Sequence, residues 1–137
     1  MSQTFFGAHY QWYYVPQSGT SSNGMNIQAI KGTNIALTEA IKNYVEKRLG
    51  ELDRVLTHLG EPQNAHVEVG MISNHHKNGD IFRFEINLKV PGQLLRASFE
   101  SSDLYKSIDL GKDELERQIR SLKEKLLSKK RRDKRGE

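Results

Sequence analysis

The residues of this sequence best suited to chemistry are the lysines and arginines at its C-terminal end. Residues 121–137 hold eight basic and three acidic side chains, whereas the rest of the chain is close to neutral. Cationic side chains neutralise phosphates and release counterions, a main source of affinity for nucleic acids. We therefore favour RNA backbone as the partner over a purely solubilising role for this segment. The basic residues of its last part are Lys129, Lys130, Arg131, Arg132, Lys134 and Arg135.

A second group of cations precedes this segment. Its members fall between the residues of an apolar stripe, so on a helix they face solvent. Charged helix faces are common, and on spacing alone a merely solvated face is the plainer interpretation. The residues concerned are Arg117, Arg120, Lys123 and Lys125.

Other kinds of chemistry find little support. The chain has no cysteine, which excludes disulfides, thiolate zinc sites and cysteine nucleophiles. His75 and His76 lie in a glycine-containing segment without metal-ligand spacing, so we predict a plain hairpin loop there. The sequence shows no nucleophile elbow, Walker loop or converging carboxylate pair. We expect no enzyme activity, cofactor, metal or small-molecule substrate.

Composition divides the chain into three parts. Residues 1–24 hold six of the eleven aromatic residues and end in a flexible run, as in an arm followed by a linker. Residues 25–127 carry the apolar patterns of one domain. Residues 128–137 are too polar to be buried, and we expect them to be disordered until bound. The arm either contacts RNA or protein through its rings, or precedes a true translation start at Met25.

Apolar periodicity predicts the elements of the domain. Thr38 is the expected cap of a first helix that runs to about Leu59, where Gly60 and Pro62 end it. Ser102 or Asp103 caps a second helix, whose stripe extends to about Leu126. The first stripe contains Ile41, Val45, Leu49, Leu52, Leu56 and Leu59.

Alternation of apolar and polar residues predicts four strands. They begin near Met25, Ala65, Phe82 and Gln93, and in the first we expect Met25, Ile27 and Ala29 to face the core. The order β-α-β-β-β-α predicts a two-layer α+β fold, with a four-stranded sheet and two helices on one face, like a double-stranded-RNA-binding domain.

Two segments carry a family resemblance. Residues 37–45 (LTEAIKNYV) open the first helix, residues 103–109 (DLYKSID) open the second, and residues 116–118 (ERQ) follow at the expected place. Over residues 25 to about 126, the chain resembles the ribosome hibernation promoting factors and ribosome-associated inhibitors. It resembles their short form, and its basic end favours the promoting class, because the inhibitor-like class carries an acidic tail.

The resemblance implies a cytoplasmic, monomeric protein of stationary or stressed cells that needs no membrane. It would bind the small ribosomal subunit and its ribosomal RNA in the channel of messenger RNA and of A- and P-site transfer RNA. Translation would be inhibited by occupancy, and whole ribosomes would be stabilised in an inactive state or paired.

The resemblance also implies RNA contacts on both helices, and we expect these side chains on the surface. The family places cations at Lys42, Arg48, Arg117, Lys123 and Lys125. Lys112 and Arg120 are further candidates, although Gly111-Lys112 replaces a usually apolar pair and Arg120 is shifted by one position from the family's pattern. Glu51 and Glu114 also depart, since short relatives often carry lysine there.

Two other functions fit the same residues. A general double-stranded-RNA-binding module would share the α+β scaffold and recognise A-form shape through phosphates and 2′-hydroxyls. Alternatively, the second helix and the basic end would bind an acidic protein, and such binding would survive nuclease treatment.

Overall fold

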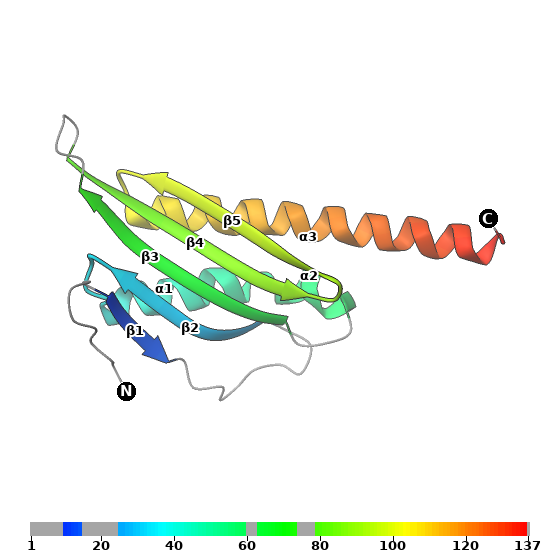
Figure 1. Ribbon diagram of the computed structural model, residues 1–137, viewed down its shortest axis with the longest axis horizontal. Coiled ribbons are helices and arrows are strands. Elements are labelled where there is room, and N and C mark those ends of the chain that lie inside the picture. Colours follow the sequence, from blue (N-terminus) through cyan, green and yellow to red (C-terminus); the bar gives the residue numbers. More distant parts are fainter. Residues whose placement is uncertain (1–9, 15–24, 60–62, 74–78, 137) are drawn as a thin grey trace.

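The computed structural model describes residues 10–14, 25–59, 63–73 and 79–136. They form one sheet in the order β1-β2-β3-β4-β5, in which β2 and β3 are parallel and the other neighbours are antiparallel. Figure 1 shows the helices on one face of this sheet and the other face open. The strands are β1 (Tyr10–Tyr14), β2 (Met25–Thr33), β3 (Gln63–Ser73), β4 (Asp80–Val90) and β5 (Gln93–Ser101). The helices are α1 (Glu39–Gly50), α2 (Asp53–Leu56), the 3-10 turn η1 (Thr57–Leu59) and α3 (Leu104–Lys134).

The predicted α+β class and its four mixed strands, β2 to β5, are confirmed, and a fifth strand from the arm extends the sheet. β1 runs antiparallel to β2, with Tyr10 opposite Thr33 and Tyr14 opposite Ala29. The backbone of β1 thus occupies the edge of β2. The expected linker at residues 18–24 and the histidine pair at 75 and 76 lie outside the described residues.

A register shift corrects the expected inward face of β2. The pairing with β3 is irregular between Ile27 and Ala29, so alternation is interrupted there. Beyond the shift, Ile30 is fully buried while Ala29 is not, and the prediction for Ala29 was wrong. An extra residue in one strand moves every later side chain to the opposite face, and a simple alternation pattern cannot show this.

The first predicted helix is interrupted. Its start is confirmed, because the Thr38 hydroxyl accepts a hydrogen bond of 3.2 Å from the Ile41 amide. However, α1 ends at Gly50, and Leu52 then bonds back to the Leu49 carbonyl in a tighter turn. This turn keeps both leucines fully buried, so the apolar stripe survives although the helix does not continue. The predicted stop at Gly60 and Pro62 is outside the described residues.

The second predicted helix is longer than expected. The Asp103 carboxylate caps it by accepting from the Tyr105 amide, as one of the two predicted choices. Instead of ending near Leu127, α3 continues to Lys134, so the expectation of a disordered end was wrong. Lysine and arginine have good helix propensity, and extending an existing helix avoids the cost of nucleation. Figure 1 shows this part of α3 projecting beyond the sheet.

The core lies between the sheet and the helices, and at Gly111 the backbone of α3 lies directly against β4. Phe84 is fully buried at the centre of β4. A Cβ atom added at Gly111 would lie only 2.6 Å from Cε1 of the Phe84 ring. Close packing on this ring therefore compensates for the low helix propensity of a glycine in the middle of α3.

We expect Gly111→Ala to destabilise the fold by about 1–2 kcal/mol, because overpacking against Phe84 outweighs the gain in helix propensity. Urea unfolding would measure the change. Gly50→Ala is the matched control, since no neighbouring atom lies within 4 Å of the added Cβ. Equal stability of the two variants would contradict close packing at Gly111.

Candidate nucleic-acid interface

The structure separates the predicted cations into two groups. The helix-face cations lie on α1 and on the part of α3 that covers the sheet, and each forms an ion pair with an acidic side chain. They are Lys42, Arg48, Lys112, Arg117 and Arg120. The distal cations lie in the last part of α3 and form no ion pair with any described residue. They are Lys123, Lys125, Lys129, Lys130, Arg131 and Arg132.

Arg48 belongs to a polar contact that joins α1 to α3. Its Nε donates to Oδ1 of Asp109 at 2.8 Å, and the Tyr44 hydroxyl donates to the same oxygen at 2.7 Å. This hydrogen bond raises the pKa of Tyr44 above its ordinary value. The Tyr44 ring also packs edge-on against Tyr105, with 4.7 Å between ring centroids, so Tyr105 takes part in packing as well as being partly exposed. Arg48 therefore has a structural role in addition to any role in binding.

Lys42 and Lys112 are more buried than a surface position implies. Only 8% of Lys42 and 9% of Lys112 is exposed, which corrects the expectation that they lie open. The Lys42 ammonium lies 2.7 Å from Glu39, and that of Lys112 lies 3.5 Å from Glu51 and 3.6 Å from Glu116. Long side chains can cover apolar surface with their stems while the charged end reaches an acidic partner, and this explains the burial.

Arg117 and Arg120 are paired but remain exposed. Arg117 donates through Nε and Nη2 to the two oxygens of Glu114, at 2.9 and 2.6 Å, yet 71% of its side chain is exposed. These hydrogen bonds, with a third from Gln118, lower the pKa of Glu114 to about 2. Arg120 is 61% exposed and lies 3.7 Å from Glu116. Both guanidinium groups can reach a phosphate without unfolding any part of the domain.

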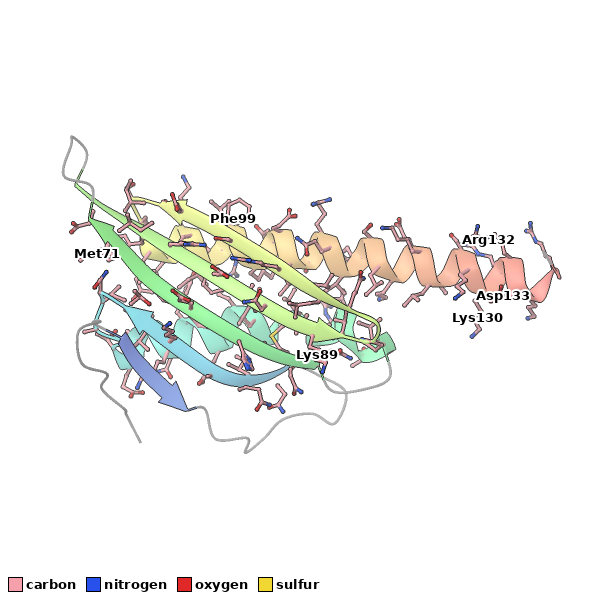
Figure 2. The ribbon with its side chains drawn as sticks, in the orientation of Figure 1. Met71, Lys89, Phe99, Lys130, Arg132 and Asp133 are labelled. Atoms are coloured by element: carbon pink, nitrogen blue, oxygen red, sulfur yellow. The ribbon has the colours of Figure 1, made fainter. Side chains whose placement is uncertain are left out.

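The distal cations occupy a straight, solvent-exposed helix. All but Lys123 are exposed, and Lys123 is half-buried. Figure 2 shows Lys130, Arg132 and Asp133 on the part of α3 that projects beyond the sheet. Helical periodicity places Lys125, Lys129 and Arg132 on one side and Lys123 and Lys130 on another. A phosphate backbone can therefore approach this segment from more than one direction.

Sequence reasoning missed two features of the surface. Leu126 was expected at the end of the buried stripe, but it is 47% exposed. Leu127 is 55% exposed, and both leucines border a hollow with Leu59. The open face of the sheet was given no role, although it carries a polar hollow across four strands. Alternation did place these polar residues away from the core, but it could not show which of them adjoin.

No described helix is long and apolar enough to cross a membrane. Within the same ranges, no three His, Cys, Asp or Glu side chains are grouped so as to hold a metal ion.

We expect Glu114→Gln to lower stability at neutral pH by less than about 1 kcal/mol, because its partner Arg117 is largely exposed. Since the folded protein lowers the pKa of Glu114, its contribution is present above about pH 4.5 and is lost as the pH falls through about 2. The difference in unfolding free energy between the two proteins should therefore shrink across this interval. A pH-independent difference in urea unfolding would contradict the pairing, and Asp113→Asn serves as a neighbouring control.

Two solved structures are similar to this chain over most of their length. The crystal structure of the Thermus thermophilus Protein Y N-terminal domain is 39% identical, covers 68% of this chain and 92% of that one, and gives a TM-score of 0.54. A ribosomal subunit interface protein from Coxiella burnetii is 25% identical, covers 72% and 96% of the two chains, and also gives a TM-score of 0.54.

Curated relatives are similar over the same region. A ribosome hibernation promotion factor from Deinococcus radiodurans is 34% identical over 99 residues, and one from Staphylococcus aureus (strain COL) is 35% identical over 97 residues. These matches cover 72% and 71% of this chain but only 50% and 48% of the relatives, so the chain spans about half their length. The family described as sigma 54 modulation protein / S30EA ribosomal protein matches residues 28–127. The chain belongs to this family, which confirms the resemblance seen in the two helix-opening segments.

Proposed function

We propose that this protein is a ribosome hibernation factor. It binds the small ribosomal subunit in the channel of messenger RNA and of A- and P-site transfer RNA, and inhibits translation by occupying it. Inactive ribosomes are thereby stabilised, or paired, in the cytoplasm of stationary or stressed cells. The protein acts as a monomer, and the proposal requires no catalytic step, cofactor or small-molecule substrate.

The observation that carries this proposal is the membership of residues 28–127 in a family whose curated relatives are named ribosome hibernation promotion factors. The exposed cations of α3 supply a physical means of binding. Neutralised phosphates release counterions, and this gain does not depend on RNA sequence. A rigid helix also holds its charges in place before binding, so less conformational entropy is lost than for a flexible tail.

All eleven predicted cations are proposed as RNA contacts, but the structure supports unequal contributions. The distal cations have no acidic partner among the described residues, so approaching phosphates break no ion pair. Arg117 and Arg120 must exchange Glu114 and Glu116 for phosphate, although both remain exposed. Arg48 and Lys112 take part in contacts between α1 and α3, and Lys42 is largely buried and paired with Glu39. We expect these three cations to contribute least.

We expect the purified protein to co-sediment with small ribosomal subunits and to inhibit cell-free translation in proportion to the subunits occupied. Added messenger RNA and initiator transfer RNA should displace it, because they compete for the same channel. Sucrose gradients with the protein tracked by immunoblot would measure its co-sedimentation with subunits and its displacement. The amount of protein synthesised in the cell-free reaction would measure the inhibition of translation. Unchanged protein synthesis at saturating concentrations of this protein would contradict the proposal. Binding to any long RNA duplex as tightly as to small subunits would instead favour a general double-stranded-RNA-binding module.

Replacing Lys129, Lys130, Arg131 and Arg132 by glutamine should weaken binding to small subunits and flatten its dependence on salt. Each lost phosphate contact should reduce the slope of log affinity against log salt by roughly 0.7–0.9. Glutamine retains good helix propensity, so the melting temperature should not change.

Arg117→Gln/Arg120→Gln is the comparison variant for this experiment. It should reduce the slope less per cation, because both arginines already have acidic partners. If the four distal glutamines leave both affinity and slope unaltered, the distal cations do not contact RNA.

A further inference from the structure

We infer that a hollow on the open face of the sheet, lined mainly by polar residues and called the amide hollow below, binds one unpaired nucleotide of RNA. The inference rests on the proposed function only in taking RNA as the partner. The lining residues of β3 and β4 alternate with buried residues such as Ala65 and Leu88, so the hollow lies on the sheet face that the helices do not cover. Figure 1 shows the helices on the other face. It has a volume of about 490 Å³, within the usual range of small-ligand sites. The lining side chains are Gln28 of β2, Asn64 and His66 of β3, Asn87 and Lys89 of β4, and Leu94 of β5.

Strand pairing places the lining residues in two adjacent rows across the sheet. Asn64 lies opposite Lys89 across the β3–β4 pair, and Lys89 lies opposite Leu94 across the β4–β5 pair. On the other side, the Gln28 amide donates to Oδ1 of Asn64 at 3.2 Å. With strands about 4.8 Å apart, four strands give the row a length of about 14 Å, enough for a single nucleotide with its phosphate. Figure 2 shows Lys89 near the end of β4.

The amides of Asn64 and Asn87 have hydrogen-bonding capacity left for a ligand, and that of Asn64 is held in place. Oδ1 of Asn64 accepts from both Gln28 and Asn26, at 3.2 and 3.3 Å, which fixes the orientation of the Asn64 amide. Its nitrogen forms no hydrogen bond with a described residue. Asn87, opposite His66 in the next row, is likewise without a described side-chain partner. The fixed Asn64 nitrogen can donate to the edge of a planar base, and the Asn87 amide can both donate and accept there.

The remaining side chains match the other parts of a nucleotide. Leu94 is 61% exposed and offers an apolar surface for the face of a base. Lys89 supplies a positive charge at the rim for a phosphate. RNA-binding proteins commonly recognise unpaired bases by combining contact on the base face with hydrogen bonds along the base edge.

Charge separates this hollow from its neighbour on the same face. The neighbouring hollow is lined by Glu68 and Glu85 as well as Arg83, and Glu85 already pairs with Arg83 and Arg96 at 2.8 Å. No carboxylate lines the amide hollow in the part of the chain that the structure describes. A phosphate therefore meets less acidic side-chain surface at the amide hollow than at the neighbouring hollow.

Short single-stranded RNA tests the inference directly. Fluorescence anisotropy would compare binding of labelled heptamers of adenylate, cytidylate and uridylate with that of an abasic heptamer of equal charge. The unaltered protein should bind at least one base-containing heptamer more tightly than the abasic one. Asn64→Ala/Asn87→Ala should reduce that difference by about tenfold, as the loss of one or two hydrogen bonds implies, and leave abasic binding unchanged.

Ser98→Ala is the matched control, because it removes a polar group from the same face outside the hollow. This variant should keep the full difference in affinity between the base-containing and the abasic heptamers. The inference is overturned if the unaltered protein binds all heptamers and the abasic strand equally, or if the double variant keeps the whole difference while its circular dichroism and melting temperature are unchanged. Should the double variant unfold, Asn87→Asp replaces it, since an added carboxylate must weaken binding of base-containing RNA if the hollow is occupied.

Co-sedimentation of the unaltered protein with ribosomes tests the proposed function separately. Protein that binds small subunits but shows no preference for bases overturns the hollow alone. Protein that prefers base-containing RNA but never binds subunits supports the hollow and overturns the ribosomal function.

Discussion

The close packing of α3 against β4 is the contact on which the arrangement of charges depends. Gly111 allows the helix backbone to lie against the Phe84 ring, and a larger residue would hold the two apart. Because a helix of 31 residues is a nearly rigid rod, the position of this contact sets where its distal end points. A small change of angle at Gly111 would therefore displace the distal cations far more than the residues near the core.

The contact between α1 and α3 adds a second constraint. Asp109 of α3 accepts hydrogen bonds from Tyr44 and Arg48 of α1. Lys112 of α3 also forms an ion pair with Glu51, at the end of α1. These groups connect the two helices along a partly exposed seam, where individual ion pairs contribute little but a connected set also fixes orientation. The same pairing neutralises much of the positive charge over the sheet. The net positive field of the protein is consequently concentrated on distal α3.

Much of the fold could be predicted because local patterns determine it. Thr38 and Asp103 are typical capping residues, whose side chains accept hydrogen bonds from backbone amides in the first turn of each helix. The alternation around Phe84 fits only a strand with one buried face. The bulge after Ile27 and the break after Gly50 depend on tertiary packing, which a single sequence does not display. The helical end of α3 was missed because polarity was taken to mean disorder, although a helix already nucleated in the core extends at little cost.

In the candidate site, too, contacts between residues close in sequence could be predicted, whereas contacts between distant residues could not. The pairing of Glu114 with Arg117 could have been read from their separation of three residues, and it was overlooked in favour of the family's pattern of cations. The contact of Arg48 with Asp109 spans 61 residues and requires the fold. The row from Gln28 to Leu94 likewise requires strand register.

A surface formed by such non-local neighbours differs in kind from the charged helix. Distal α3 can attract any phosphate backbone, whereas the proposed nucleotide site presents amides from three strands to the edge of a base. Affinity and selectivity for RNA are therefore expected to reside on different parts of this protein. Each part can then change in sequence without disturbing the other.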